Sequence, residues 1–337
     1  MSLLYITEHG GMVGFEGNRI TIRTKEHLRS LPVETIDSIT IMGASQLTTN
    51  CMEQCMKRGI PVSFMSKGGS YFGRLVSTGN INAKLHRKQG ALYETEFALE
   101  LSKRIIEAKI HNQMVILRRY ARNNTENAEE VLALISQIRI CKNKIVDGTL
   151  TSTGQLIGYE GNAARLYFDG LSRVIDQDFI FHGRSRRPPK DEFNSLISLG
   201  YSILMNEIYN IIEAHGLNLY FGFLHKDDEH HPTLCSDLME EWRPVIVDTV
   251  AMSLINGHEM TKEDFQQGLD MPGCYLTREG LKFFLSKLED RLNTKTKYFP
   301  DTDQNLSFRS GIEHQVMALI RAISSEDASA YHPLKIR

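Results

Sequence analysis

The pattern of apolar residues changes once along this chain, near residue 80, and this change limits the fold more than any other feature. Before it, short runs alternate apolar and polar residues between glycine-marked turns, which is typical of β-strands. After it, apolar residues recur every three or four positions, as in Phe97, Leu101 and Ile105, which is the spacing of one helix face. The sequence therefore predicts an α+β protein, with a small β-rich N-terminal domain at 1–80 and a larger all-α domain at 81–337.

Glycines and one proline mark the clearest element ends. A helix is expected over 47–58 and a second, long and apolar, over 194–215. Gly59 and Gly216 follow them directly, and glycine readily adopts the left-handed conformation that ends a helix. Pro244 is expected to start or kink a helix, because its ring removes a backbone donor and crowds the preceding turn.

The composition excludes several classes of protein. The chain has 337 residues, of which 41% are hydrophobic and 24% charged, and a formal net charge of −2, so it is no generally basic DNA-coating protein. Its five cysteines form no Cys-x-x-Cys pair, which argues against a zinc ribbon or a disulfide framework. No segment reaches the ~18 to 20 apolar residues of a membrane span, and the N-terminus does not resemble a secretory signal. We expect a cytoplasmic protein that makes no contact with membranes.

Three short segments place metal-ligand residue types among apolar or small neighbours. They are Gly158 to Ala164 with Glu160, Phe223 to Lys226 with His225, and Asp237 to Pro244 with Asp237, Glu240 and Glu241. Carboxylates and imidazoles in such surroundings lose solvation unless a partner compensates them. A divalent cation would compensate all three segments at once, so together they indicate a metal site for phosphodiester chemistry.

Each segment also has a simpler interpretation. Glu160 could be a first-turn glutamate that complements a helix dipole, and His225 could be a hydrogen-bonded core histidine. The acids at 237, 240 and 241 follow helical spacing, so they could form one solvated face, although Trp242 and its apolar neighbours favour burial. His230 and His231 are weaker ligand candidates, because they lie in a charged run before a proline.

Basic residues gather in two places. Arg184, Arg186, Arg187 and Lys190 surround a Pro-Pro turn, and a second group lies along the first long helical stretch, at Lys103, Arg104, Lys109, Arg118, Arg119 and Arg122. Either group could be an ordinary solvated surface or could follow a phosphate backbone. Arg243, next to the acids, could equally pair with one of them or contact phosphate.

Taken together, the segments resemble the CRISPR adaptation integrase, the first of the CRISPR-associated (Cas) proteins. The family's pattern Gly-x-Glu-Gly-x-Ala-Ala is matched at 158–164, and its histidine after an apolar run is matched at Leu224-His225. Its pattern Asp-Leu-x-Glu-x-Phe-Arg-Pro is matched at 237–244, with Trp242 in place of phenylalanine. The basic loop and the residues after it, 191–201, are also similar to the family.

The resemblance implies a ligand set and a set of partners. Glu160, His225 and Glu240 would hold Mg²⁺ or Mn²⁺, with Asp237 as an auxiliary acid. The DNA contacts are expected from basic residues, at Arg184, Arg186, Arg187, Arg243 and, more weakly, Lys226. The family also implies a homodimer formed through the β-rich domain, a second Cas protein as partner, and double-stranded DNA as spacer precursor and CRISPR repeat.

The implied activity is that of a metal-dependent DNA endonuclease and integrase. Short DNA would enter the CRISPR array when its 3′-hydroxyl attacks a repeat phosphodiester, and no protein nucleophile is needed. Two rival hypotheses stay open from the residues alone. One is a metal-dependent phosphohydrolase of nucleotides or other small phosphate esters, with a closed pocket in place of a basic groove. The other is a scaffold without catalysis that only binds DNA or a protein.

Overall fold

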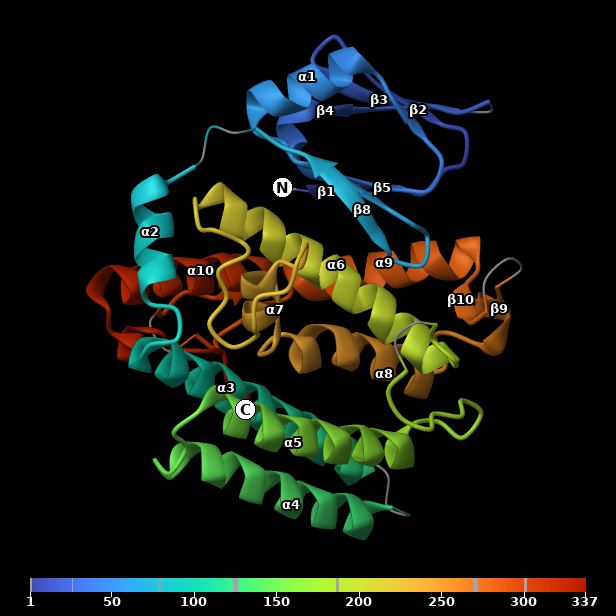
Figure 1. Ribbon diagram of the computed structural model, residues 1–337. Coiled ribbons are helices and arrows are strands. Elements are labelled where there is room, and N and C mark those ends of the chain that lie inside the picture. Colours follow the sequence, from blue (N-terminus) through green and yellow to red (C-terminus); the bar gives the residue numbers. More distant parts are fainter. Residues whose placement is uncertain are drawn as a thin grey trace. The chain divides into compact units, whose positions relative to one another are not determined.

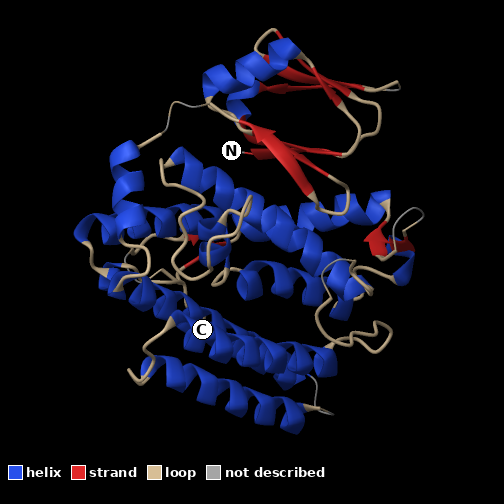
Figure 2. Ribbon diagram, in the orientation of Figure 1, coloured by secondary structure: helices blue, strands red, loops and turns tan. Residues whose placement is uncertain are grey.

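The protein, seen here in a computed structural model, divides into two compact units, Met1–Ile81 and Asn82–Arg337. The structure describes residues 2–25, 27–77, 79, 81–123, 127–185, 188–268, 272–299 and 302–337. Strands are concentrated in the first unit and helices in the second (Figure 2). The predicted order, a small β-rich part followed by a larger helical part, is confirmed.

Among its described residues, the first unit contains two four-stranded sheets, one α-helix and a short 3-10 turn, η1 (Val33–Thr35). The first sheet has the order β1-β5-β7-β8, with β1, β5 and β7 parallel and β8 antiparallel to β7; the second has the order β4-β3-β2-β6. The strands are β1 (Ser2–Ile6), β2 (Met12–Glu16), β3 (Arg19–Arg23), β4 (Leu28–Pro32), β5 (Ile36–Met42), β6 (Gln46–Leu47), β7 (Val62–Met65) and β8 (Tyr71–Leu75). Apolar side chains from both sheets and from α1 (Thr49–Arg58) form its core. The predicted end of α1 is confirmed, because Gly59 has a φ of 68°.

The second unit is built around the long helix α3 (Glu96–Asn123). This helix packs against α4 (Ala128–Val146) and α5 (Thr153–Val174), and the three lie side by side in Figure 1. Its other α-helices are α2 (Ala83–Ala91), α6 (Glu192–Ala214), α7 (Thr233–Met239), α8 (Thr249–Asn256), α9 (Arg278–Asn293) and α10 (Phe308–Ser325). Two short antiparallel strand pairs join them, β9 (Phe265–Gln267) with β10 (Cys274–Leu276) and β11 (Lys295–Thr296) with β12 (Leu306–Ser307). None of the helices described has the combination of length and apolar character that crossing a membrane requires.

The predicted end of the long apolar helix and the predicted effect of Pro244 are both confirmed. Helix α6 ends at Ala214, and Gly216 then takes a φ of 73°. Pro244 begins η2 (Pro244–Asp248), a π-helical turn between α7 and α8. Such turns occur often at functional sites, and this one follows the acidic segment directly.

Candidate metal and nucleic-acid site

Helices α3, α5 and α7 bring two of the predicted ligands to one point. Glu160 lies in α5 and Glu240 lies directly after α7, and both carboxylates contact the ammonium group of Lys109 on α3. The distance from Lys109 Nζ to Glu240 Oε2 is 2.5 Å, and Glu160 Oε1 accepts a hydrogen bond from the same nitrogen. Two acids that are far apart in the chain therefore share one buried cation.

Glu160 is not a first-turn residue. Helix α5 begins at Thr153, so Glu160 lies about two turns inside it, and the interpretation as a partner of the helix dipole is wrong. Its side chain is 21% exposed. Gly158 and Gly161 are exposed on the same helix, and a Cβ at either position would meet nothing within 4 Å. This stretch of α5 thus leaves space beside Glu160.

Asp237 organises the segment that carries His225. Its Oδ2 accepts the backbone N–H groups of Phe223 and Leu224 at 2.6 and 3.0 Å, and its Oδ1 accepts the N–H of His225 at 3.1 Å. Gly222 permits this wrapping, because a Cβ there would lie 2.8 Å from Asp237 Oδ2. The acid of the third segment therefore fixes the backbone of the second.

The same carboxylate sets the orientation of the imidazole. His225 Nδ1 lies 2.7 Å from Asp237 Oδ1, so this nitrogen donates and Nε2 is the ring nitrogen directed elsewhere. Burial opposes the charged form of His225, but the hydrogen bond and charge of Asp237 outweigh it and raise the pKa. Glu240 and Arg243 also act on this pKa, so the imidazole lies within their electrostatic reach. Histidines that bind metals typically have such a carboxylate behind them.

The acids at 237, 240 and 241 do not form a solvated face. All three are buried, with exposed fractions of 0%, 3% and 0%. Helix α7 ends at Met239, and the chain then tightens into i→i+3 hydrogen bonds, such as Trp242 N to Met239 O. As a result Glu240 contacts Lys109, whereas Glu241 accepts hydrogen bonds from Tyr331 and from the backbone of Leu334 near the C-terminus.

Two cations compensate the burial of Glu240. Arg243 Nη1 lies 2.7 Å from its Oε1, and Lys109 contacts its Oε2. Burial alone would raise the pKa of Glu240, but Arg243 and Lys109 outweigh it and lower the pKa to about 2. Burial likewise disfavours the charged Lys109, yet Glu240 and Glu160 hold its pKa above the usual value. Both shifts favour the ionised forms of Glu240 and Lys109 at neutral pH.

The donor set suits a hard divalent cation. It offers carboxylate oxygens and one imidazole nitrogen, which are ligand types for Mg²⁺ and Mn²⁺. Two carboxylates already converge on a cation, and the buried Glu240 Oε2 meets it only as an ion pair, outside hydrogen-bond geometry. In the part of the chain that the structure describes, no group of three or more His, Cys, Asp or Glu side chains is arranged to hold a metal ion. The three-ligand set stays a prediction.

The predicted DNA-contact residues lie in different surroundings. Arg184 Nη1 donates to Asn194 Oδ1 and Ser198 Oγ, both at 3.0 Å, so part of its guanidinium is engaged within the fold. Arg243 forms the ion pair described above, which is one of its two predicted roles. Lys226 is exposed beside His225. Arg186 and Arg187 lie outside the described residues.

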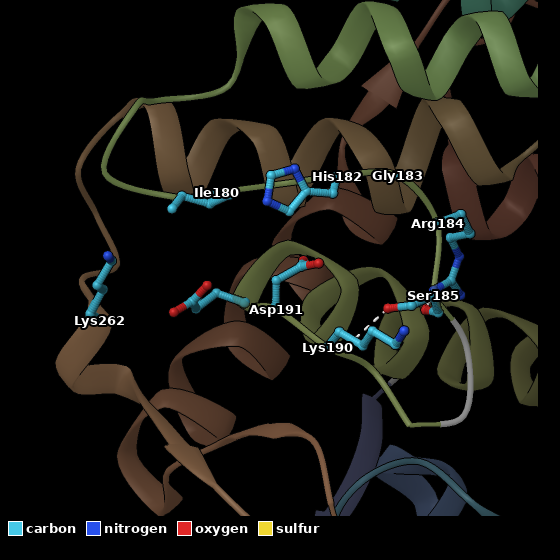
Figure 3. Close-up of a pocket in the computed structure, with 9 residues that line it drawn as sticks. Ile180, His182, Gly183, Arg184, Ser185, Lys190, Asp191 and Lys262 are labelled. Carbon is cyan, nitrogen blue, oxygen red and sulfur yellow. Dashed lines mark hydrogen bonds between the residues drawn. The ribbon is translucent and has the colours of Figure 1, made fainter.

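The basic loop borders a cavity of about 470 Å³ at the start of α6. In Figure 3 the residues Ile180, His182 and Arg184 lie above Asp191 and Lys190, and Lys262 stands at the left edge of the view. Ser185 lies beside Lys190, whose backbone N–H donates to its Oγ at 3.0 Å. The lining carries both charge signs, because the acids Asp191 and Glu192 stand among basic residues such as Lys190 and Lys262.

The two weaker ligand candidates lie apart from the acidic cluster. His230 is exposed, and a ring nitrogen of His231 lies 2.8 Å from Ser236 Oγ, so neither joins Glu160 and Glu240.

Comparison with known proteins settles the family. The family model described as CRISPR associated protein Cas1 matches residues 4–290. The chain belongs to the Cas1 family. It is 34% identical to the CRISPR-associated endonuclease Cas1 of Mycobacterium tuberculosis, with 100% of this chain and 96% of that protein covered. It is 30% identical to CRISPR-associated endonuclease Cas1 3 of Thermus thermophilus, covering 100% of this chain and 98% of that protein.

Solved structures agree on the fold of this Cas1 chain. A Cas1 protein from Thermotoga maritima superimposes with a TM-score of 0.81 at 23% identity, covering 96% of this chain and 97% of that chain. A casposase bound to its integration product gives a TM-score of 0.81 at 23% identity, covering 98% and 94%. The resemblance of the three segments is thus confirmed at the level of family and fold.

Two parts of this Cas1 site were not predicted from the sequence. Lys109 was grouped with surface cations, although it stands between Ala108 and Ile110 in an apolar stretch that could have indicated burial. The second part is Tyr201, whose ring stacks against two guanidinium groups. The Cζ atoms of Arg184 and Arg243 lie 5.5 and 5.0 Å from the centroid of this ring. Its hydroxyl donates to the buried Asp248 of η2 at 2.5 Å. Tyr201 therefore links the basic loop to the π-helical turn and to the partner of Glu240.

Proposed function

We propose that this Cas1 protein is a metal-dependent DNA integrase and endonuclease of CRISPR adaptation. It inserts short DNA, as spacers, into the CRISPR array. Family membership supports the reaction class, because the relatives from Mycobacterium tuberculosis and Thermus thermophilus are named endonucleases. The convergence of Glu160 and Glu240 on one buried cation is the observation that carries the site.

In this proposal Glu160, His225 and Glu240 hold Mg²⁺ or Mn²⁺. When bound, the ion supplies charge stabilisation at the reacting phosphate and orients the attacking oxygen. Asp237 keeps Nδ1 of His225 protonated, so that Nε2 stays available. Arg243 holds the second oxygen of Glu240, which limits the rotation of this carboxylate.

The chemistry is an exchange of one phosphodiester for another. The 3′-hydroxyl oxygen of the captured DNA forms a bond to a repeat phosphorus and gives up its proton to water. The bond from that phosphorus to the repeat's own 3′-oxygen breaks, and this oxygen takes up a proton. With water in place of the hydroxyl, the same site hydrolyses DNA. Gly158 and Gly161 leave space for a DNA backbone beside Glu160. The proposed phosphate contacts are Arg184, Arg186, Arg187, Arg243 and Lys226.

The proposed assembly is the one that the family implies. A homodimer forms through the β-rich domain, and a second Cas protein joins it to hold a DNA duplex in the cytoplasm. The acidic net charge of −2 agrees with a protein that binds DNA through a local surface and a partner.

Strand joining tests this function. The protein and its cognate second Cas partner are incubated with a labelled short duplex and a supercoiled plasmid that carries a CRISPR repeat, with Mg²⁺, Mn²⁺ or EDTA. We expect label in the plasmid only with metal, and at least about a hundredfold less with Glu160→Gln. Glu100→Gln, on the exposed part of α3, is the matched control and should join normally. Hydrolysis of small phosphate esters without joining would favour the phosphohydrolase instead.

A further inference from the structure

Lys109 is an unusual residue to find in the interior of a helical domain. Its exposed fraction is 5%, and its neighbours Ala108 and Ile110 are fully buried. Burying an ammonium group is costly unless charged partners surround it. Glu160 and Glu240 are those partners, and they arrive from two other helical segments. Lys109 therefore belongs to the acidic site and not to the basic surface of α3.

The ammonium lies where a cation shared by the two carboxylates would lie. Nζ meets Oε1 of Glu160 and Oε2 of Glu240, while the other oxygen of Glu240 is paired with Arg243. Glu240 Oε2 is buried, and the ammonium of Lys109, at 2.5 Å, is its ion-pair partner. A divalent ion held by both carboxylates would sit against this ammonium in a buried setting, where like charges repel strongly.

The net charge of this cluster would change sign on binding a divalent cation. Counted formally, with His225 neutral as a metal ligand must be, the three acids Asp237, Glu160 and Glu240 contribute −3 and the two cations Lys109 and Arg243 contribute +2. A divalent cation would turn this nearly balanced group into one with excess positive charge. A DNA phosphate beside the site would restore the balance and would give a displaced ammonium a new partner.

We infer that Lys109 is the internal counter-cation of the site and couples metal binding to DNA binding. The inference rests on the proposed function. Without metal, Lys109 holds Glu160 and Glu240 together. Metal binding displaces its ammonium toward the phosphate, so metal and DNA each raise the affinity for the other, as linkage requires. The site is then loaded with metal mainly when DNA is present.

Titration calorimetry with Mn²⁺ tests this coupling. Binding is measured with and without a short duplex whose 3′-ends lack the hydroxyl, so that no joining occurs. For the wild type we expect the duplex to strengthen Mn²⁺ binding by about tenfold or more. Lys109→Met should bind Mn²⁺ at least about tenfold more tightly than wild type without DNA, and should gain little from the duplex.

Two control variants separate this inference from the proposed function. Lys103→Met removes a lysine of the same helix that pairs with Glu100 at 2.6 Å, and it should behave as wild type. Glu160→Gln should abolish Mn²⁺ binding. If Glu160→Gln binds Mn²⁺ with wild-type affinity, the proposed metal site at Glu160 is wrong. If binding needs Glu160 but Lys109→Met shows wild-type affinity and the full effect of DNA, only the role of Lys109 is overturned.

A structural measurement covers the case in which Lys109→Met does not fold. Crystals of the wild-type protein are grown with and without Mn²⁺. We expect Nζ of Lys109 between the two carboxylates without the ion and away from them with it. An Mn²⁺ ion bound at Glu160 and Glu240 beside an unmoved ammonium would overturn the inference.

Discussion

At the scale of single residues, Asp237 is the acid that gives the site its shape. Its two oxygens accept three backbone N–H groups of residues 223–225 and the Nδ1 proton of His225. Every one of these partners is a donor, so the position requires two acceptor oxygens. Asp237 thus acts through His225 and through the backbone, and its role as an auxiliary acid stays a prediction.

The variant Asp237→Asn should weaken metal binding without removing a proposed ligand. Its amide would place a donor against backbone donors, which loosens the loop and frees the imidazole. We expect the affinity for Mn²⁺, measured by calorimetry, to fall about 10- to 100-fold. Asp228→Asn, in the exposed loop after His225, is the matched control. Unchanged affinity in Asp237→Asn would mean that His225 needs no orientation or is no ligand.

The sequence indicated which residues matter here better than it indicated how they meet. Glu160, His225, Asp237 and Glu240 could be selected because each is a polar residue in an apolar or small context. The apolar neighbours of Lys109 could have indicated its burial, but not its acidic partners, because only the packing of α3 against α5 and α7 brings them to it. The different directions of Glu240 and Glu241 depend likewise on where α7 ends.

At the scale of elements, the C-terminal segment after α10 is a structural part of the site. The sequence carries no strong signal there, yet Tyr331, Leu334 and Ile336 are buried. Asn112 of α3 donates to Leu334 O and accepts the N–H of Ile336, both at 3.0 Å. Glu241 accepts from the Tyr331 hydroxyl and the Leu334 N–H, both at 2.5 Å. The C-terminal segment thus connects α3 with Glu241, the residue next to Glu240, through hydrogen bonds.

The variant Tyr331→Phe should destabilise the protein, and more so at high pH. Burial raises the pKa of Glu241 to about 8, against the opposing hydrogen bonds of Tyr331 and Leu334. The pKa of Glu241 is higher in the folded protein than in the unfolded chain, so its protonated form favours folding. This contribution to the free energy of unfolding is complete below the pKa of the unfolded chain and is lost as the pH rises through about 8. Losing the hydroxyl raises the pKa further, because the ionised form loses a donor.

Urea unfolding measures this effect. We expect the free energy of unfolding to fall by about 1–3 kcal/mol, with the larger loss at about pH 9 and the smaller at about pH 6. Tyr275→Phe is the control, since that hydroxyl donates to Pro272 O at the surface. A loss independent of pH would mean that Tyr331 contributes only packing.

The elements themselves were largely predictable, for local reasons. Gly59 and Gly216 end helices because they take left-handed conformations. Pro244 can begin a helical turn because the N–H that it lacks has no intrahelical partner at that position. The short hairpin β11–β12 and the C-terminal segment had no comparable signal. The C-terminal segment owes its conformation to contacts with distant residues, such as Asn112 and Glu241.

At the scale of the whole molecule, the charge distribution decides how DNA can be held. The net charge is −2, so the protein as a whole offers no long-range attraction to a polyanion. Several cations already have acidic partners within the fold. Lys109 pairs with two carboxylates, and Arg309 pairs with Glu207 and Glu289. DNA binding must then depend on a few exposed cations near the site, and its salt dependence should be modest.

Lys226 is the exposed cation directly after His225, and its contribution can be measured through salt. If it contacts one phosphate, Lys226→Ala should lower the slope of log affinity against log salt by about 0.9, because one fewer counterion is released. Anisotropy of a labelled duplex over a series of KCl concentrations gives this slope. Lys144→Ala is the matched control, because Lys144 is comparably exposed on α4 and pairs with Asp147. Equal slopes for Lys226→Ala and wild type would mean that Lys226 contacts no phosphate. An equal reduction in Lys226→Ala and Lys144→Ala would indicate attraction by the overall charge of the protein and not by a contact at the site.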